Sequence, residues 1–222
     1  MIGLSKNGLH CHSVAERLGP QLNCHRLIMG DVQGQYRRLH DCVQPGVLVL
    51  FVGINPGLRS AQVGHHFAGH SNRFWKLLHE SELVSEPLTY REDRRLSEWQ
   101  LGLTNIIGRC TAGIDALDPV EYRQGVASLK RKIRRYQPPI VALLGVTIFR
   151  ILFPPKDYVK CPLNLGLTTS QLAGAQIFLL PNPSGRNAHY SYRQMLTAFQ
   201  VLRDKMEHAR KKDGTSTIIA TQ

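Results

Sequence analysis

Two segments of this sequence place an asparagine side chain beside proline and glycine. The first is Gly53-Ile54-Asn55-Pro56-Gly57, and the second is Asn182-Pro183-Ser184-Gly185. A residue before proline is biased away from helical geometry, and glycine lets backbone N–H groups approach a ligand closely. A carboxamide is a poor base, but it carries both hydrogen-bond donors and acceptors. These segments are therefore suited to orienting a water molecule or a polar ligand, although each alone is also compatible with an ordinary turn at the end of a strand.

Each asparagine follows an apolar run that is typical of a buried strand. Four strands are predicted, at residues 47–52, 103–107, 140–144 and 176–180. The predicted helices cover residues 33–43, 71–80, 119–136, 146–153 and 190–210, whereas residues 58–69 and 109–117 are predicted as loops and 156–174 as irregular. Alternating strands and helices predict an α/β fold with a mainly parallel sheet and helices on both faces. Because ligands bind at the carboxyl ends of such strands, we expect both asparagine loops to face one crevice.

The length and composition are typical of one folded domain with extensions at both ends. The chain has 222 residues, of which 42% are hydrophobic. We expect residues 1–32 to form a weakly structured or disordered N-terminal extension, residues 33–210 to form the domain, and residues 211–222 to form a flexible C-terminal tail.

The charge and the cysteines narrow the class of partner and the compartment. Lysine and arginine outnumber the acidic residues by 28 to 16, a net charge of +12. This excess favours a polyanion, nucleic acid first and an acidic membrane surface second, and no apolar run approaches the length of a membrane span. The five cysteines include no CxxC pair, which disfavours a disulfide framework and an iron–sulfur cluster and is typical of a reducing compartment.

Several common catalytic motifs are absent from the sequence. It contains no Walker-type glycine loop, no GxGxxG after a strand, no GxSxG and no HExxH. His66 and His70 have a spacing that could serve a metal, but they fall in a predicted loop without nearby carboxylate or cysteine partners. The pairs Cys11-His12 and Cys24-His25 match no standard zinc spacing. We therefore expect neither a metal nor an organic cofactor.

Four motifs in a fixed order carry a family resemblance. They are Gly53 to Leu58, Gly64-His65-His66-Phe67, Asn72 to Lys76, and Asn182 to Gly185. Together they resemble the mismatch-specific uracil/thymine DNA glycosylases, the second family of the uracil-DNA glycosylase superfamily, over residues 45–205. The resemblance implies a three-layer α/β/α sandwich, in agreement with the fold that the strand and helix pattern predicts.

The resemblance also implies an activity and the residues that carry it. Such an enzyme flips uracil, and in some members thymine or ethenocytosine, out of mismatched double-stranded DNA and hydrolyses the N-glycosidic bond, leaving an abasic site. Asn55 is the implied catalytic residue. The implied base pocket comprises Gly53, Ile54, Phe67, His66 and Asn182. The implied DNA contacts are Arg59, Ser60, Pro183, Ser184, Gly185, Arg186 and Asn187.

Individual roles follow from the same resemblance. Backbone N–H groups of Ile54 and Phe67 would donate to the uracil carbonyl oxygens, on the logic of an oxyanion hole. Phe67 would stack on the flipped base, with simple core packing as the alternative. Arg186 stands where the best-known bacterial members carry leucine, so the residue that fills the gap left by the flipped nucleotide stays open.

Asn182 stands where related, faster uracil glycosylases carry histidine, which predicts slower chemistry. His66 is a partial substitute for that histidine or, as the default, an ordinary surface histidine. No lysine lies in the motifs to form a Schiff base, so lyase activity is not expected.

The expected partner is double-stranded DNA with a G·U or related mismatch, bound by a monomer without membrane attachment. The expected location is the cytoplasm and nucleoid of a bacterium or the nucleus of a eukaryote. Two alternatives stay open. One is a DNA lesion-binding module of the same fold that does not cut. The other is a small-molecule α/β hydrolase using the same crevice, although the charge of +12 and the second loop count against it.

Overall fold

The computed structural model describes residues 38–153 and 165–219, with side chains up to residue 211. The predicted N-terminal extension, the first part of the predicted helix 33–43 and the cysteines at positions 11, 24 and 161 lie outside these residues. The chain divides into a unit of residues 1–35 and a unit of residues 36–222, and the description below concerns the second unit.

A five-stranded sheet forms the centre of this unit. Its strands are β1 (Val49–Gly53), β2 (Leu101–Asn105), β3 (Ile140–Leu144), β4 (Gly166–Leu172) and β5 (Ala175–Leu180). They lie in the order β2-β1-β3-β5-β4, and every neighbouring pair is parallel except β4 with β5. All residues of β1, β2 and β3 are buried, as expected for parallel strands that are covered on both faces.

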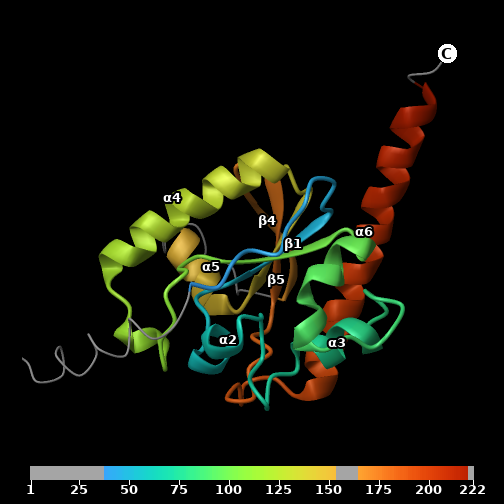
Figure 1. Cartoon of the computed structure of the whole chain (residues 1–222). Coiled ribbons are helices and arrows are strands. Elements are labelled where there is room, and N and C mark those ends of the chain that lie inside the picture. Colours follow the sequence, from blue (N-terminus) through green and yellow to red (C-terminus); the bar gives the residue numbers. More distant parts are fainter. Residues whose placement is uncertain (1–37, 154–164, 220–222) are drawn as a thin grey trace, which may run out of the picture. The chain divides into compact units, whose positions relative to one another are not determined.

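Helices cover both faces of the sheet, so the predicted three-layer α/β/α architecture is confirmed. The helices are α2 (Leu58–Val63), α3 (Phe74–Glu80), α4 (Pro119–Tyr136), α5 (Val146–Leu152) and α6 (Tyr192–Ile219), with 3-10 helices η1 (Tyr90–Trp99) and η2 (Ile114–Ala116). Figure 1 shows α4 and α5 on one side of the sheet and α3 with α6 on the other. Among the described helices, none combines the length and the apolarity that a bilayer crossing requires.

Aromatic packing fixes the α3–α6 side. Phe51 of β1 packs edge-on against Phe74 of α3 at a centroid distance of 5.3 Å and stacks on Phe199 of α6 at 6.3 Å. All three rings are completely buried. Removing such a ring typically costs about 3–5 kcal/mol of stability. This cluster holds α3, and the loop before it, against the strand that carries Asn55.

The predicted start of α4 is confirmed in detail. Asp118 accepts the Val120 N–H at 2.6 Å, forms a capping box with Glu121, and is followed by Pro119 at the first helical position. Within the basic run of this helix, Lys132 is not a freely solvated side chain. Its ammonium group lies 2.8 Å from Asp41 and donates to Thr104 at 2.7 Å, so it ties α4 to β2.

Four local predictions are wrong. Residues 58–63 form a short helix rather than a loop. Gly64 ends this helix in the left-handed conformation, with φ of +78°. Residues 166–172 form the antiparallel edge strand β4 rather than irregular chain. Residues 38–43 are not helical, since Cys42 pairs with Leu103 of β2 through two backbone hydrogen bonds. Helix α6 begins at Tyr192 and continues past the predicted end at residue 210 to Ile219.

Candidate active site

A cavity of about 430 Å³ opens at the carboxyl ends of the parallel strands. Gly53 ends β1, Asn105 ends β2 and Leu144 ends β3, and all three line it. Asn182 lines it from the segment that follows β5. The two asparagine loops therefore do face one crevice, as the positions of the strands in the sequence predict.

Most of the predicted site residues meet in this cavity. Its lining includes Gly53, Ile54, Asn55, Arg59, Ser60, His66, Phe67, Asn182, Ser184, Gly185 and Arg186. Pro183 and Asn187 are not part of the lining. Pro183 is buried and its carbonyl accepts the Arg73 N–H at 2.9 Å, whereas the Asn187 amide donates to the Asn182 carbonyl at 2.8 Å. These two residues shape the second loop from behind.

The surroundings of Asn55 fix the orientation of its amide. Its Nδ2 donates to the Thr111 hydroxyl at 2.7 Å and to the carbonyls of Arg109 at 3.2 Å and Pro56 at 3.3 Å. Carbonyl oxygens only accept, so the nitrogen must face them. Within the described part of the chain no donor bonds to Oδ1. The oxygen of Asn55 is thus the atom left to accept a hydrogen bond from a bound molecule.

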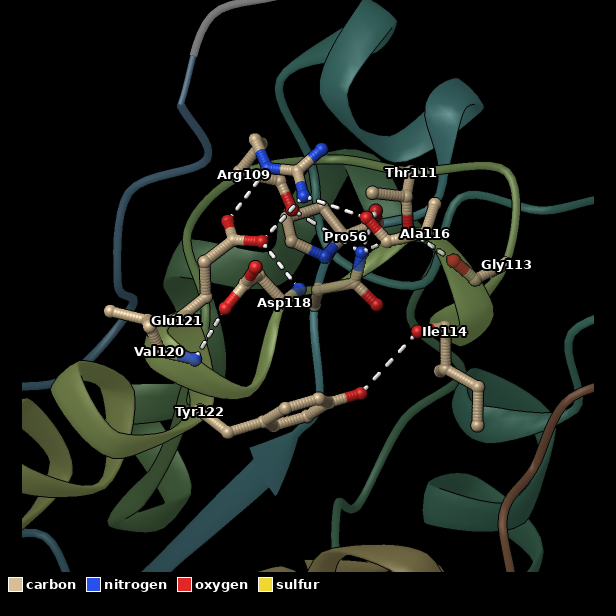
Figure 2. A network of polar contacts seen from close by, with 11 residues as sticks. Pro56, Arg109, Thr111, Gly113, Ile114, Ala116, Asp118, Val120, Glu121 and Tyr122 are labelled. Atoms are coloured by element: carbon tan, nitrogen blue, oxygen red, sulfur yellow. Dashed lines mark hydrogen bonds and ion pairs between the residues drawn. The ribbon is translucent and has the colours of Figure 1, made fainter. Parts of the chain in front are cut away.

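Thr111 reinforces this orientation. Its hydroxyl donates to the Gly113 carbonyl at 2.7 Å, so toward Asn55 the oxygen can only accept. Figure 2 shows the hydrogen bond between Thr111 and Gly113 within a wider network that includes Arg109, Glu121 and Asp118 at the start of α4. The sequence predicts only a loop for residues 109–117, and the hydrogen bond between residues 55 and 111 depends on the parallel pairing of β1 with β2.

Asn182 is held in the opposite sense. Its Oδ1 accepts the Ser184 N–H at 3.0 Å in a local Asx turn. No described residue accepts from its Nδ2. The second loop therefore presents an amide donor to the cavity, where the first loop presents an acceptor.

Phe67 adopts a backbone conformation that non-glycine residues rarely adopt. Its φ is +52°, in a loop between α2 and α3. Its ring lies 4.3 Å from that of Phe74 and also lines the cavity, so core packing and stacking on a ligand are both open to it. Neither the Phe67 N–H nor the Ile54 N–H bonds to another described residue. Strained backbone of this kind is concentrated at functional sites.

His66 is not a surface residue, so the default interpretation of it is wrong. Its side chain is only 2% exposed, and its ring Nε2 lies 2.8 Å from the His40 carbonyl, which requires a proton on Nε2. Burial lowers the pKa of His66, so the ring is neutral at neutral pH, with its single proton already donated. It contributes shape and an acceptor nitrogen to the pocket rather than a proton.

Asp93 of η1 organises the loop that carries His66 and Phe67. Its carboxylate accepts from the His66 backbone at 3.0 Å and contacts the His65 ring at 3.1 Å. Cys42, His66 and Asp93 bring potential metal-ligand atoms within 4.8 Å of one another. Burial raises the pKa of the Cys42 thiol to about 12, and Asp93 contributes to this shift, so the thiol stays protonated. Hydrogen bonds within the protein account for this cluster, and the expected absence of a metal stays a prediction.

The predicted DNA contacts differ in accessibility. Ser60 is 6% exposed, and its hydroxyl accepts the Ala68 N–H at 3.0 Å. Arg59 donates from Nε to the Ala68 carbonyl at 2.8 Å. Arg186 is exposed and reaches across to the Ala112 carbonyl at 3.3 Å. Ser60 thus has a structural bond in the folded protein, and the DNA-binding roles of all three stay predictions.

Sequence reasoning missed Asn105, which lies at the base of the cavity. Its side chain is buried, and no described residue bonds to its amide. A Cβ on Gly53 would lie 2.5 Å from the Asn105 Oδ1, so glycine at position 53 leaves room for this amide. The available signal was an amide residue within the predicted strand 103–107, beside the polar Thr104.

Among the described residues, the side chains that line the cavity limit the kinds of catalytic group that the site can offer. The described lining residues include asparagines, hydroxyls, arginines and one histidine, but no carboxylate, thiol or lysine. No serine hydroxyl in it bonds to a histidine ring. Such a site offers neither a strong general base nor an activated nucleophile, but several amides and backbone N–H groups.

Comparison with known proteins agrees with this geometry. The family model of the uracil DNA glycosylase superfamily matches residues 40–203. The fold is similar to the solution NMR structure of a uracil DNA glycosylase candidate from Methanosarcina acetivorans, with a TM-score of 0.52 and 13% sequence identity, over 78% of this chain and 99% of the other. The family match covers most of the sequence and includes both asparagine loops. The chain therefore belongs to the uracil DNA glycosylase superfamily.

Proposed function

We propose that this protein is a monofunctional, mismatch-specific uracil/thymine-DNA glycosylase that acts as a monomer on double-stranded DNA. The observation that carries the proposal is the fixed amide of Asn55, whose nitrogen is held by Thr111 and Arg109 and whose oxygen is left to accept. Membership of the uracil DNA glycosylase superfamily supports the reaction class.

The oxygen of Asn55 would orient the attacking water. An amide cannot remove the proton of water to any extent, so the deoxyribose must develop positive charge before attack. The C1′–N1 bond breaks with its electron pair leaving on the base, and the water oxygen then bonds to C1′ and releases a proton. Such a dissociative reaction needs placement and charge stabilisation more than a strong base.

The departing base carries negative charge and needs donors. Ile54, Phe67 and Asn182 line the cavity, and the backbone N–H groups of the first two and the Nδ2 of Asn182 have no acceptor among the described residues, so they suit this role. Each preorganised donor of this kind typically contributes about 2.7–4 kcal/mol to a barrier. With an asparagine amide at position 182, where the faster related glycosylases carry histidine, we expect weaker stabilisation of the departing base and a slower reaction.

Recognition of the base would fall to Phe67 and Asn105. The Phe67 ring offers a stacking face, and the Asn105 amide has one acceptor and two donors at the base of the cavity. Uracil presents a donor at N3 and an acceptor at O4, which an amide can pair with. Base extrusion costs least at a mispair, so a preference for G·U follows partly from weak pairing.

The second loop and the arginines suit the DNA backbone and the gap in the stack. Arg186 is exposed at the rim of the cavity beside Ser184 and Gly185, and Arg59 lines the same cavity. We propose that Arg186 fills the space of the flipped nucleotide or contacts the opposite base. Pro183 and Asn187 support this loop from behind.

The test is direct excision. The protein is incubated with end-labelled G·U and A·U duplexes in EDTA, followed by hot alkali. Cleavage at uracil, faster for G·U than for A·U, supports the proposal. A gel shift without cleavage would indicate a lesion-binding module instead, and no interaction with DNA would favour a small-molecule enzyme. Binding should weaken steeply with salt, because phosphate contacts release counterions.

A further inference from the structure

The loop that orients Asn55 is tied to helix α4 by a bidentate ion pair. Arg109 donates from Nε to Glu121 at 2.7 Å and from a terminal nitrogen to the second carboxylate oxygen at 2.6 Å. The same guanidinium donates to the Ala116 carbonyl at 2.9 Å. The backbone carbonyl of Arg109 is one of the acceptors of the Asn55 amide. One residue therefore both accepts from the proposed catalytic amide and anchors the loop, and Figure 2 shows the contacts of Arg109 with Glu121.

Glu121 provides a rigid anchor. It occupies the third position of α4, and its carboxylate also accepts the Asp118 N–H at 2.9 Å. The 18-residue helix is fixed to the domain by the buried residues Leu129 and Ile133. The capping box of α4 and the ion pair thus share one carboxylate, so the loop is positioned by the helix.

Two further bonds between this loop and its surroundings are longer. The Thr111 N–H lies 3.3 Å from the Pro56 carbonyl, and the exposed Arg186 lies 3.3 Å from the Ala112 carbonyl. Bidentate arginine–carboxylate pairs are shorter and stronger than neutral hydrogen bonds. Each partner raises or lowers the other's pKa in the direction that keeps the pair charged, since hydrogen bonding raises the pKa of Arg109 and lowers that of Glu121.

We propose that Arg109 and Glu121 are positioning residues of the active site. Their ion pair holds residues 109–118 so that the Arg109 carbonyl and the Thr111 hydroxyl keep accepting from Asn55, which leaves Oδ1 of Asn55 toward the substrate. The catalytic consequence rests on the proposed function, whereas the orientation of the amide does not.

The activity test uses Arg109→Met, Glu121→Gln and the double variant in single-turnover assays with saturating enzyme on G·U DNA. Displacing a catalytic group by about 1 Å can cost on the order of 100-fold, so we expect losses of about ten- to 100-fold in rate. DNA affinity should change less than about twofold. The double variant should be little slower than the slower single variant, because both remove one interaction. Thr111→Val, which removes one acceptor of the Asn55 amide directly, gives the reference for the loss of that single bond.

The matched control is Arg203→Met. Arg203 pairs with Glu82 and so joins α6 to the segment after α3, in the layer that packs against the opposite face of the sheet. The Arg203→Met substitution removes one arginine–glutamate pair and one positive charge, as Arg109→Met does, but it leaves residues 109–118 unchanged. Its rate should equal that of the wild type.

A second readout follows the amide itself. In protein labelled with ¹⁵N-asparagine, the signals missing from Asn55→Ala identify the Asn55 side-chain NH₂. Its exchange with solvent should be slow in the wild type and in Arg203→Met and faster in the Arg109 and Glu121 variants.

Unchanged exchange in the Arg109 and Glu121 variants, or a loss of rate matched by an equal loss of DNA affinity, would overturn the proposal. If the wild type excises nothing, the proposed function fails, and the exchange rates still decide whether the ion pair positions Asn55.

Discussion

The two asparagine loops have similar sequences, but each leaves a different atom of its amide available to a ligand. In the loop after β1, the nitrogen of Asn55 donates hydrogen bonds to Arg109 and Thr111, which lie 54 and 56 residues away in the sequence. In the loop after β5, the oxygen of Asn182 accepts a hydrogen bond from the N–H of Ser184, only two residues away. One loop therefore offers an acceptor to the cavity and the other a donor.

This difference shows that the chemical role of an amide is set by which of its atoms the protein engages. Long-range partners fix Asn55, and they depend on β2 and α4 being in place. A local turn fixes Asn182, and it needs only its own loop. In the proposed reaction the acceptor serves the water and the donor serves the leaving base.

The largest expected effect comes from removing the acceptor. Asn55→Ala should lower the single-turnover rate by at least about 100- to 1,000-fold, the range for loss of one preorganised polar group. DNA affinity should stay close to that of the wild type, since the proposal gives the Asn55 amide no contact with the sugar–phosphate backbone of the DNA. Rapid-quench assays and binding titrations measure the two quantities. A rate within about tenfold of the wild type would remove Asn55 from its proposed role.

The glycines of the two loops differ in the space around them. A Cβ on Gly185 would lie 2.4 Å from the Ser71 Cβ and 2.7 Å from the Ser71 carbonyl oxygen. Gly57 has φ of −71° and nothing within 4 Å of its Cβ position. We expect Gly185→Ala to destabilise the protein by about 1–3 kcal/mol through overpacking, and Gly57→Ala to change the stability little. Denaturant unfolding of both variants tests the contrast, and equal effects would contradict it.

Replacing the donor of the second loop should cost less than replacing the acceptor of the first. Asn182→Asp keeps an oxygen for the Ser184 N–H but removes the donor and adds negative charge beside the leaving base. We expect a loss of rate of about tenfold or more, equivalent to about 1.4 kcal/mol, with unchanged melting temperature. Asn182→Ala, which loses the turn as well, is the comparison. If Asn182→Asp were faster than the wild type, the amide would not be a donor in the reaction.

The smallest effect concerns the stability contributed by Glu121. Its folded pKa lies below the ordinary value of 4.5, chiefly because of its hydrogen bond with Arg109. The carboxylate therefore stabilises the fold above pH 4.5, and this contribution is lost as the pH falls through the lowered folded value. Its side chain is 27% exposed, so we expect less than about 1 kcal/mol. The unfolding free energies of wild type and Glu121→Gln in urea should differ at pH 7, and the difference should shrink as the pH falls below 4.5; a constant difference would contradict the assignment.

The sequence by itself determined the strand and helix alternation and the location of the site. Continuous apolar runs such as residues 140–144 are typical of strands buried on both faces, and Asp118 followed by Pro119 marks the start of α4. Since parallel strands place their carboxyl ends on one edge, the two asparagine loops had to meet. The glycosylase motifs then indicated the superfamily, which the family match confirmed.

Only the tertiary structure decided how the side chains of the site are held. The burial of His66, the free amide of Asn105 and the anchoring of Asn55 depend on residues far away in sequence, and no local pattern encodes such pairs. Edge strand β4 escaped prediction because one partner strand and a solvent-facing side leave it few apolar residues. A hydrogen bond has direction, and that direction depends on the neighbouring atoms, so the orientation of the Asn55 amide could be determined only once the sheet had brought Arg109 and Thr111 to it.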